Sequence, residues 1–212
     1  MTNHRRVDGR QSRTKIWWSL LEGWCATSGM CPFTRCPITC VVSCRPPQYY
    51  TELFYTLRSA AETDLIYLHI NSPGGDFNTG LQIINNMLAS EAHVVTVLEA
   101  RAYSMAAFIF LSGDELIVHD NCQLMFHTYS SSFAGKGSEQ LAEVHALGSW
   151  FEKVTTRLCT PFLSATDIAH ILQGSDLWMD SDEIRRRLAR IKPSRAKAAT
   201  RRPAARKARA SV

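Results

Sequence analysis

The apolar residues in the middle of the chain follow two different spacings. Residues 49–61, 79–90 and 138–158 place apolar side chains at intervals of three and four, which predicts amphipathic helices. Residues 65–70 (LIYLHI) and 93–98 (HVVTVL) are instead short apolar runs with β-branched residues, which is typical of buried strands. The pattern therefore predicts strands that alternate with helices.

Shorter segments continue this alternation. Two more strands are expected at residues 116–118 and 123–127, and two more helices at 108–111 and 164–172. The first long strand ends in the turn Asn71-Ser72-Pro73-Gly74-Gly75. The fold class expected is α/β, with repeated strand-turn-helix units and a mainly parallel sheet. Reactive groups in such a sheet gather at the carboxyl ends of its strands.

Composition divides the 212 residues into three zones. Residues 1–46 are basic and rich in Trp and Cys, residues 47–191 form the one patterned domain, and residues 192–212 form a basic tail. From Arg185 onward there are twelve Lys or Arg and no acidic residue, so the preceding 184 residues carry a net charge of −7. We expect the tail to be disordered or partly helical. It could bind nucleic acid or anionic lipid through phosphates, or be a solvated extension.

Several classes of site and location are disfavoured by the sequence. Five of the seven cysteines lie between Cys25 and Cys44, but none of their spacings is the CxxC pair of common zinc sites. Neither GxGxxG nor GxxxxGK[ST] occurs, so we expect no phosphate cradle and no cofactor. The basic start lacks the apolar segment of a secretory signal, and no stretch approaches the roughly 18 apolar residues of a spanning helix. These features favour a cytoplasmic protein with free thiols.

Two turns that follow predicted strands carry groups suited to chemistry. Ser104 opens an apolar helix among small neighbours, where a serine nucleophile would be accessible to substrate. The alternative role for a serine in that position is a helix cap. The amides of the Gly74-Gly75 turn could stabilise an oxyanion, and the alternative is an ordinary tight turn.

A histidine and an aspartate complete the set of candidates. His127 closes an apolar strand before a polar loop, which suits a general base held by a rigid element. Asp176, in GSDLWMDSDE, could orient an imidazole, although a helix cap is the alternative and Asp180 and Asp182 compete with it. We interpret the other histidines of the patterned region as structural: His69, His93, His119, His145 and His170.

In combination, these segments resemble the Clp protease proteolytic subunit over about residues 64–188. YLHINSPGGD is similar to the family's strand and SPGG turn, AYSMAAFIFLSG to its nucleophile segment, LMFH to the strand ending in its histidine, and SDLWMDSDE to its D-x-[FW]-[ML]-x-x-x-E segment. The resemblance implies a Clp-type fold, related to that of the crotonases. It also implies that Ser104, His127 and Asp176 are catalytic and that the amides of Gly75 and Met105 are oxyanion donors.

The resemblance further implies a serine endopeptidase without metal or cofactor, a homo-oligomeric ring as its assembly and an AAA+ unfoldase as a partner. It ends upstream of Tyr49, where a Cys-rich segment replaces the family's axial loop, helix and first strand. One hypothesis is a shifted reading frame or a misplaced start in the coding sequence. Ala100 replaces a frequent Gly, and EIRRRLARI replaces the usual YGL[IV]D. With the basic tail, these departures resemble the Clp-like peptidases of phages and prophages.

Four functions therefore stay open. The first is a peptidase core that needs an unfoldase to degrade folded proteins. The second is a phage head-maturation protease that trims capsid or scaffold proteins without ATP. The third is a structural ring with an idle site, whose tail contacts DNA. The fourth is crotonase-like chemistry on acyl-CoA, which the complete Ser-His-Asp set disfavours.

Overall fold

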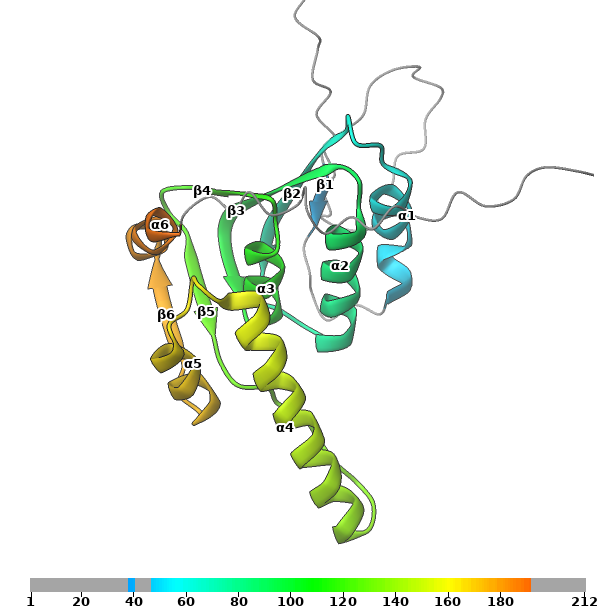
Figure 1. The fold of residues 1–212 in the computed structure, drawn as a ribbon, viewed down its shortest axis with the longest axis vertical. Helices are drawn as coiled ribbons and strands as arrows, with labels where there is room; N and C mark the ends of the chain where they lie inside the picture. Colours follow the sequence, from blue (N-terminus) through cyan, green and yellow to red (C-terminus); the bar gives the residue numbers. More distant parts are fainter. Residues whose placement is uncertain (1–37, 41–46, 192–212) are drawn as a thin grey trace, which may run out of the picture.

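The computed structural model of the chain describes residues 38–40 and 47–191. The Cys-rich segment around Cys25–Cys44, apart from residues 38–40, and the tail at 192–212 lie outside the described residues. The described part forms a single six-stranded sheet with helices packed on one of its faces (Figure 1). The fold class expected from the sequence, an α/β protein with a mainly parallel sheet, is therefore confirmed.

The order of the strands determines which loops meet. Along the sheet the order is β1-β2-β3-β5-β6, and β4 pairs with β3 outside this path. All pairs are parallel except β5 with β6. β3 is long enough to pair with β4 along its first half and with β5 along its last three residues. The strands are β1 (Ile38–Cys40), β2 (Leu65–Ser72), β3 (His93–Tyr103), β4 (Glu115–Val118), β5 (Gln123–Phe126) and β6 (Leu177–Asp180).

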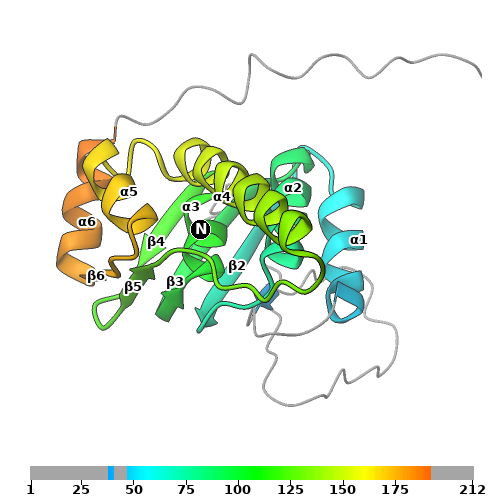
Figure 2. The same cartoon turned by 90° about the horizontal axis from the view of Figure 1, so that it is seen from below.

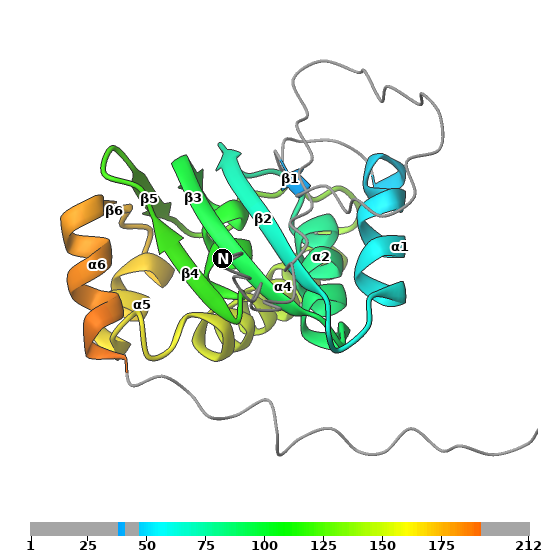
Figure 3. The ribbon, with the colours of Figure 1, turned by 90° about the horizontal axis from the view of Figure 1, so that it is seen from above.

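Helices α2, α3 and α4 lie over the same face of the sheet, with α1 beside α2 and with α5 and α6 near the β6 edge (Figure 2). The opposite view shows β2, β3 and β4 in front of the helices (Figure 3). The helices are η1 (Pro47–Tyr50), α1 (Thr51–Ser59), α2 (Phe77–Ala89), α3 (Met105–Leu111), α4 (Gly137–Cys159), α5 (Ala165–Leu172) and α6 (Ser181–Arg190). None of the helices in the described ranges has the length and apolar content needed to cross a membrane.

The core lies between the sheet and these helices. Alternate residues of β2, which are Ile66, Leu68 and Ile70, are at most 1% exposed and belong to one apolar cluster with Ile83 of α2 and Phe108 of α3. Each such buried side chain contributes about 1.5–3 kcal/mol. Many of the apolar residues whose spacing predicted the strands and helices are therefore buried in this one core.

Several elements differ from the prediction. β3 continues to Tyr103 instead of ending at residue 98. α3 begins at Met105, directly after Ser104, and ends at Leu111, so it includes the predicted helix body at 108–111. β1, β6 and α6 were not predicted. β6 buries only Met179, so its apolar signal is weak. α6 is rich in Arg and buries only Ser181 and Ile184, so its apolar signal is weak, and it is held instead by capping and ion pairs.

Candidate active site

The register of the sheet places four turns at one edge. Ser72 of β2 pairs with Ala102 of β3, so the Gly74-Gly75 turn lies beside the junction of β3 and α3. Tyr103 pairs with Met125 of β5, the neighbouring strand, and His127 directly follows the end of β5. Phe126 of β5 pairs with Leu177 of the antiparallel β6, so Asp176 enters at the same edge. Neighbouring strands lie about 4.8 Å apart. The sheet therefore orders the glycine turn, Ser104, His127 and Asp176 in space.

The glycine turn is packed against Ser104. Gly74 has a φ of +95°, and a Cβ atom there would lie 2.7 Å from the carbonyl oxygen of Tyr103 and 2.8 Å from the Cβ of Ser104. Its N–H donates to the Ser72 hydroxyl at 3.1 Å. Asp76 then caps α2, since its Oδ1 accepts from the N–H of Thr79 at 2.7 Å. Only glycine combines this backbone conformation with so close an approach.

Ser104 has an unusual backbone conformation for a serine. Its φ is +53° and its ψ is −128°, and it is the only non-glycine residue with positive φ in the described ranges. It precedes the first residue of α3, but its side chain makes no capping hydrogen bond, which disfavours the helix-cap alternative. Its N–H donates to the carbonyl of Met125 at 2.8 Å. The residue is half-buried and lies at a strained junction of β3 and α3.

Two backbone amides near Ser104 have no hydrogen-bond partner among the described residues. Among the described residues, neither the N–H of Gly75 nor that of Met105 donates a hydrogen bond. Met105 is the first residue of α3, where an N–H has no partner within the helix. The Gly74-Gly75 turn and the start of α3 lie side by side, because a Cβ atom on Gly74 would be 3.4 Å from the nitrogen of Met105. These are the two amides that the resemblance to the Clp protease subunit implies as oxyanion donors.

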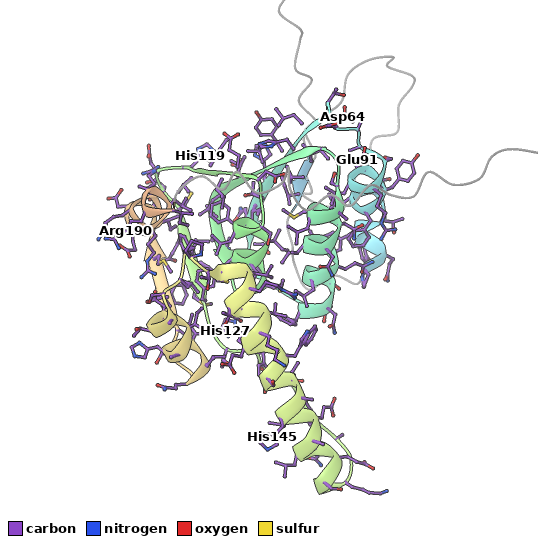
Figure 4. The ribbon with its side chains drawn as sticks, in the orientation of Figure 1. Asp64, Glu91, His119, His127, His145 and Arg190 are labelled. Atoms are coloured by element: carbon purple, nitrogen blue, oxygen red, sulfur yellow. The ribbon has the colours of Figure 1, made fainter. Side chains whose placement is uncertain are left out.

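His127 and Asp176 lie at this edge, but no side-chain hydrogen bond joins them to each other or to Ser104 in the described chain. His127 is half-buried, whereas Asp176 is exposed. Figure 4 shows His127 where α4 meets the body of the molecule, while His119 lies toward the opposite end and His145 lies on the projecting half of α4. Of these three histidines, only His127 is near the turns described above.

The competing carboxylates have other roles. Asp180 caps α6, because its Oδ1 accepts from the N–H of Glu183 at 2.9 Å. Asp182 pairs with Arg185 at 3.7 Å on the same helix. Asp176 caps no helix among the described elements. The helix cap that was the alternative role for Asp176 is provided by Asp180. Asp176 remains the aspartate next to His127 in the register of β5 and β6.

An aromatic cluster on α4 ties the segments of the site together. Phe151 of α4 is 2% exposed, and its ring centroid lies 5.6 Å from that of Phe77, 6.2 Å from that of Phe108 and 5.4 Å from that of Tyr129. Phe77 follows the glycine turn, Phe108 lies one turn beyond Ser104, and Tyr129 lies two residues beyond His127. These contacts pack the three segments against α4, and the sequence pattern did not predict them.

The two cysteines in residues 47–191 are unsuited to nucleophilic chemistry. Burial raises the pKa of both the Cys122 and the Cys159 thiols, so they stay protonated. The described residues also contain no group of three or more His, Cys, Asp or Glu side chains arranged to hold a metal ion.

Comparison with known proteins identifies the family. The family model described as Clp protease matches residues 47–198, and the chain therefore belongs to the Clp protease family. It is 30% identical over 122 residues to the ATP-dependent Clp protease proteolytic subunit 3 of Streptomyces avermitilis, covering 56% of this chain and 55% of that protein.

Two further relatives match shorter stretches. The ATP-dependent Clp protease proteolytic subunits of Ostreococcus tauri and Chlorella vulgaris are 35% and 34% identical over 80 residues, which is 37% of this chain and 40% of each relative. The chain thus spans about half the length of the Streptomyces relative and two fifths of the other two.

Proposed function

We propose that this chain is a serine endopeptidase in which Ser104 attacks the peptide carbonyl, His127 is the general base and Asp176 orients His127. The conformation of Ser104 is the observation that carries the proposal. A serine with positive φ and no capping bond is costly, at about 1–3 kcal/mol, and such strain collects at functional sites. The register of β3, β5 and β6 supports His127 and Asp176 as partners of Ser104, because both flank neighbouring strands at the same edge of the sheet.

The proposed reaction has two stages, acylation and hydrolysis. His127 takes the proton of Ser104 as the serine oxygen bonds to the peptide carbonyl, and the resulting oxyanion accepts hydrogen bonds from the amides of Gly75 and Met105. His127 then gives its proton to the leaving amine, and the peptide bond breaks to leave an acyl-enzyme. Water, deprotonated by His127, hydrolyses that ester and restores Ser104. Asp176 stabilises the imidazolium in both steps.

Among the residues that the structure describes, the side-chain hydrogen bonds of this mechanism are not formed. Catalytic hydrogen bonds are often long in the free state and tighten when substrate binds. Because Asp176 is exposed, contacts from an assembly or from substrate are needed to hold it against His127. We infer that the active form is a homo-oligomer.

The relatives carry the words "ATP-dependent" in their names. This sequence has neither GxGxxG nor GxxxxGK[ST]. We therefore assign any ATP requirement to a separate AAA+ unfoldase, and expect short peptides to be cleaved without ATP.

A fluorophosphonate probe followed by peptide mapping tests the proposal. We expect an adduct on Ser104 that is lost in Ser104→Ala and strongly reduced in His127→Ala, because an unactivated serine reacts slowly. Ser112→Ala is the matched control, since the Ser112 hydroxyl donates to the carbonyl of Phe108 on the same helix and lies outside the site. An adduct that persists in Ser104→Ala, or a folded protein that never reacts, would contradict the proposal.

A further inference from the structure

A pocket of about 610 Å³ is lined in part by the residues that follow His127 in the chain. The loop after β5, the middle of α4 and the end of α5 form its walls, and its lining begins at Thr128, the residue after His127. A larger cavity, of about 860 Å³, lies at the other end of the sheet, where His93 begins β3. The smaller pocket is therefore the one whose lining includes the residue next to the proposed general base. Its volume lies within the range of pockets that bind ligands.

The lining of this pocket is polar and carries one carboxylate. Thr128, Tyr129, Ser130 and Ser131 contribute hydroxyl-bearing side chains, and Glu152 is the only charged residue in the lining. Within residues 47–191, Glu152 forms no hydrogen bond and no ion pair. Acidic residues outnumber basic ones in that range by seventeen to nine.

The walls of the pocket are held in place. The ring of Tyr129 packs against that of Phe151 at 5.4 Å, and its hydroxyl donates to the carbonyl of Val144 at 3.4 Å. Gly148 leaves space in the wall, because a Cβ atom there would lie 3.5 Å from the Tyr129 hydroxyl, an ordinary contact. Aromatic rings beside a carboxylate suit a long cationic side chain, whose stem packs on a ring while its head meets the charge.

We propose that this pocket receives a Lys or Arg side chain of the substrate within two residues of the scissile bond, and that Glu152 is its ion-pair partner. The inference rests on the proposed function, because it takes His127 to mark the position of the scissile bond. The pocket gives the peptidase a preference for basic sequences. The hydroxyl groups of its lining accept hydrogen bonds from the same cation.

The assembled full-length protein and a library of peptides test this inference. Mass spectrometry of the products gives the residues that flank each cleaved bond, and a pair of fluorogenic peptides that differ only by Lys or Gln at the enriched position gives kcat/KM. We expect the wild type to favour the Lys peptide by about five- to tenfold and Glu152→Gln to reduce that ratio to about one. Glu152→Lys is expected to favour an acidic residue at the same position.

The matched control is Glu143→Gln, an exposed residue of α4 that does not line the pocket. It is expected to keep the wild-type ratio and to react with the fluorophosphonate probe as the wild type does. A wild type that reacts with the probe but shows no basic preference would overturn this inference alone, as would a preference that survives in Glu152→Gln. Failure of the wild type to react at all would overturn the proposed function beneath it.

Discussion

At the scale of single residues, the position of Ser104 depends on two neighbours with little freedom to move. The carbonyl of Met125 holds its N–H, and Gly74 packs against its Cβ. A backbone with positive φ is maintained only where such contacts determine it. Ser104 and the oxyanion turn are thus a single packed unit, and a change on one side of the contact is expected to move the other.

Gly74→Ala tests this coupling. The added methyl group would meet the carbonyl of Tyr103 at 2.7 Å and Ser104 at 2.8 Å, and alanine is also strained at a φ of +95°. We expect kcat/KM for a peptide to fall by about 10²-fold, because a displacement of about 1 Å in a catalytic group has that scale of effect.

The control for Gly74→Ala is Gly135→Ala. Gly135 also has positive φ, of +141°, but a methyl group there would meet only the flexible end of the Glu139 side chain, at 3.0 Å. Its activity is expected to stay near that of the wild type. Equal activities for the two variants in a steady-state assay would show that Gly74 does not position Ser104.

At the scale of elements, α5 and α6 are joined by a network of charges around Arg187. Its guanidinium binds Asp167 at 2.7 Å and Glu183 at 2.6 Å, and its side chain is 18% exposed. Burial by itself would raise the pKa of Asp167, but hydrogen bonds from Arg187 and from Ser164 outweigh it and lower that pKa to about 2. The network supports the segment between α5 and α6, which contains Asp176.

The sign of the pH dependence follows from that shift. The pKa of Asp167 is lowered from 3.8, so its stabilising contribution is fully present above pH 3.8 and is lost as the pH falls through about 2. Asp167→Asn is therefore expected to reduce the free energy of unfolding at neutral pH by about 1–2 kcal/mol, after allowance for its partial exposure to water. In urea titrations, the difference from the wild type should narrow as the pH falls below 4.

Asp182→Asn is the control for this prediction. Asp182 lies on α6 and forms an ion pair, with Arg185 at 3.7 Å, but its side chain is 88% exposed. We expect little change in stability at any pH. A difference between the wild type and Asp167→Asn that stayed constant from neutral pH to pH 2 would rule out the proposed linkage.

The sequence showed the elements of the site better than their arrangement. Ser104 and His127 could be proposed because each follows an apolar run that is visible by itself. The pairing of β3 with β5, which brings these residues together, joins segments that are about twenty residues apart and depends on packing. β6 buries only Met179 and so shows little pattern, although Asp176 directly precedes it at the edge. The position of Glu152 near the loop after His127 also depends on how α4 packs, so it could not be predicted from the sequence.

At the scale of the whole molecule, the first half of α4 extends away from the sheet and helices (Figure 1). Its apolar residues Leu141 and Val144 are 60% and 39% exposed, although they lie on the same side of the helix as the buried Phe151. Exposed apolar residues grouped in this way typically mark a protein interface. The second half of α4 carries the aromatic cluster, so the projecting surface and the candidate site share one helix.

The double variant Leu141→Glu/Val144→Glu tests whether this surface joins subunits. We expect a smaller particle by size-exclusion chromatography with light scattering, because two charges would be buried in the interface. Peptidase activity should fall with particle size, since Asp176 is exposed in the single chain and the proposed mechanism needs it held against His127. The thermal unfolding of the isolated chain should change little, because both side chains are already in water.

Ala142→Glu/Ala146→Glu adds the same two charges to another face of the same half-helix, where both residues are exposed. It separates a loss of interface from a general effect of charge. If the two double variants form particles of the same size as the wild type, α4 does not join the subunits. If both double variants dissociate, added negative charge anywhere on the first half of α4 disrupts the assembly, and the apolar residues have no special role. Dissociation and loss of activity in the Leu141/Val144 variant alone would connect the apolar stripe of α4 to the formation of the site.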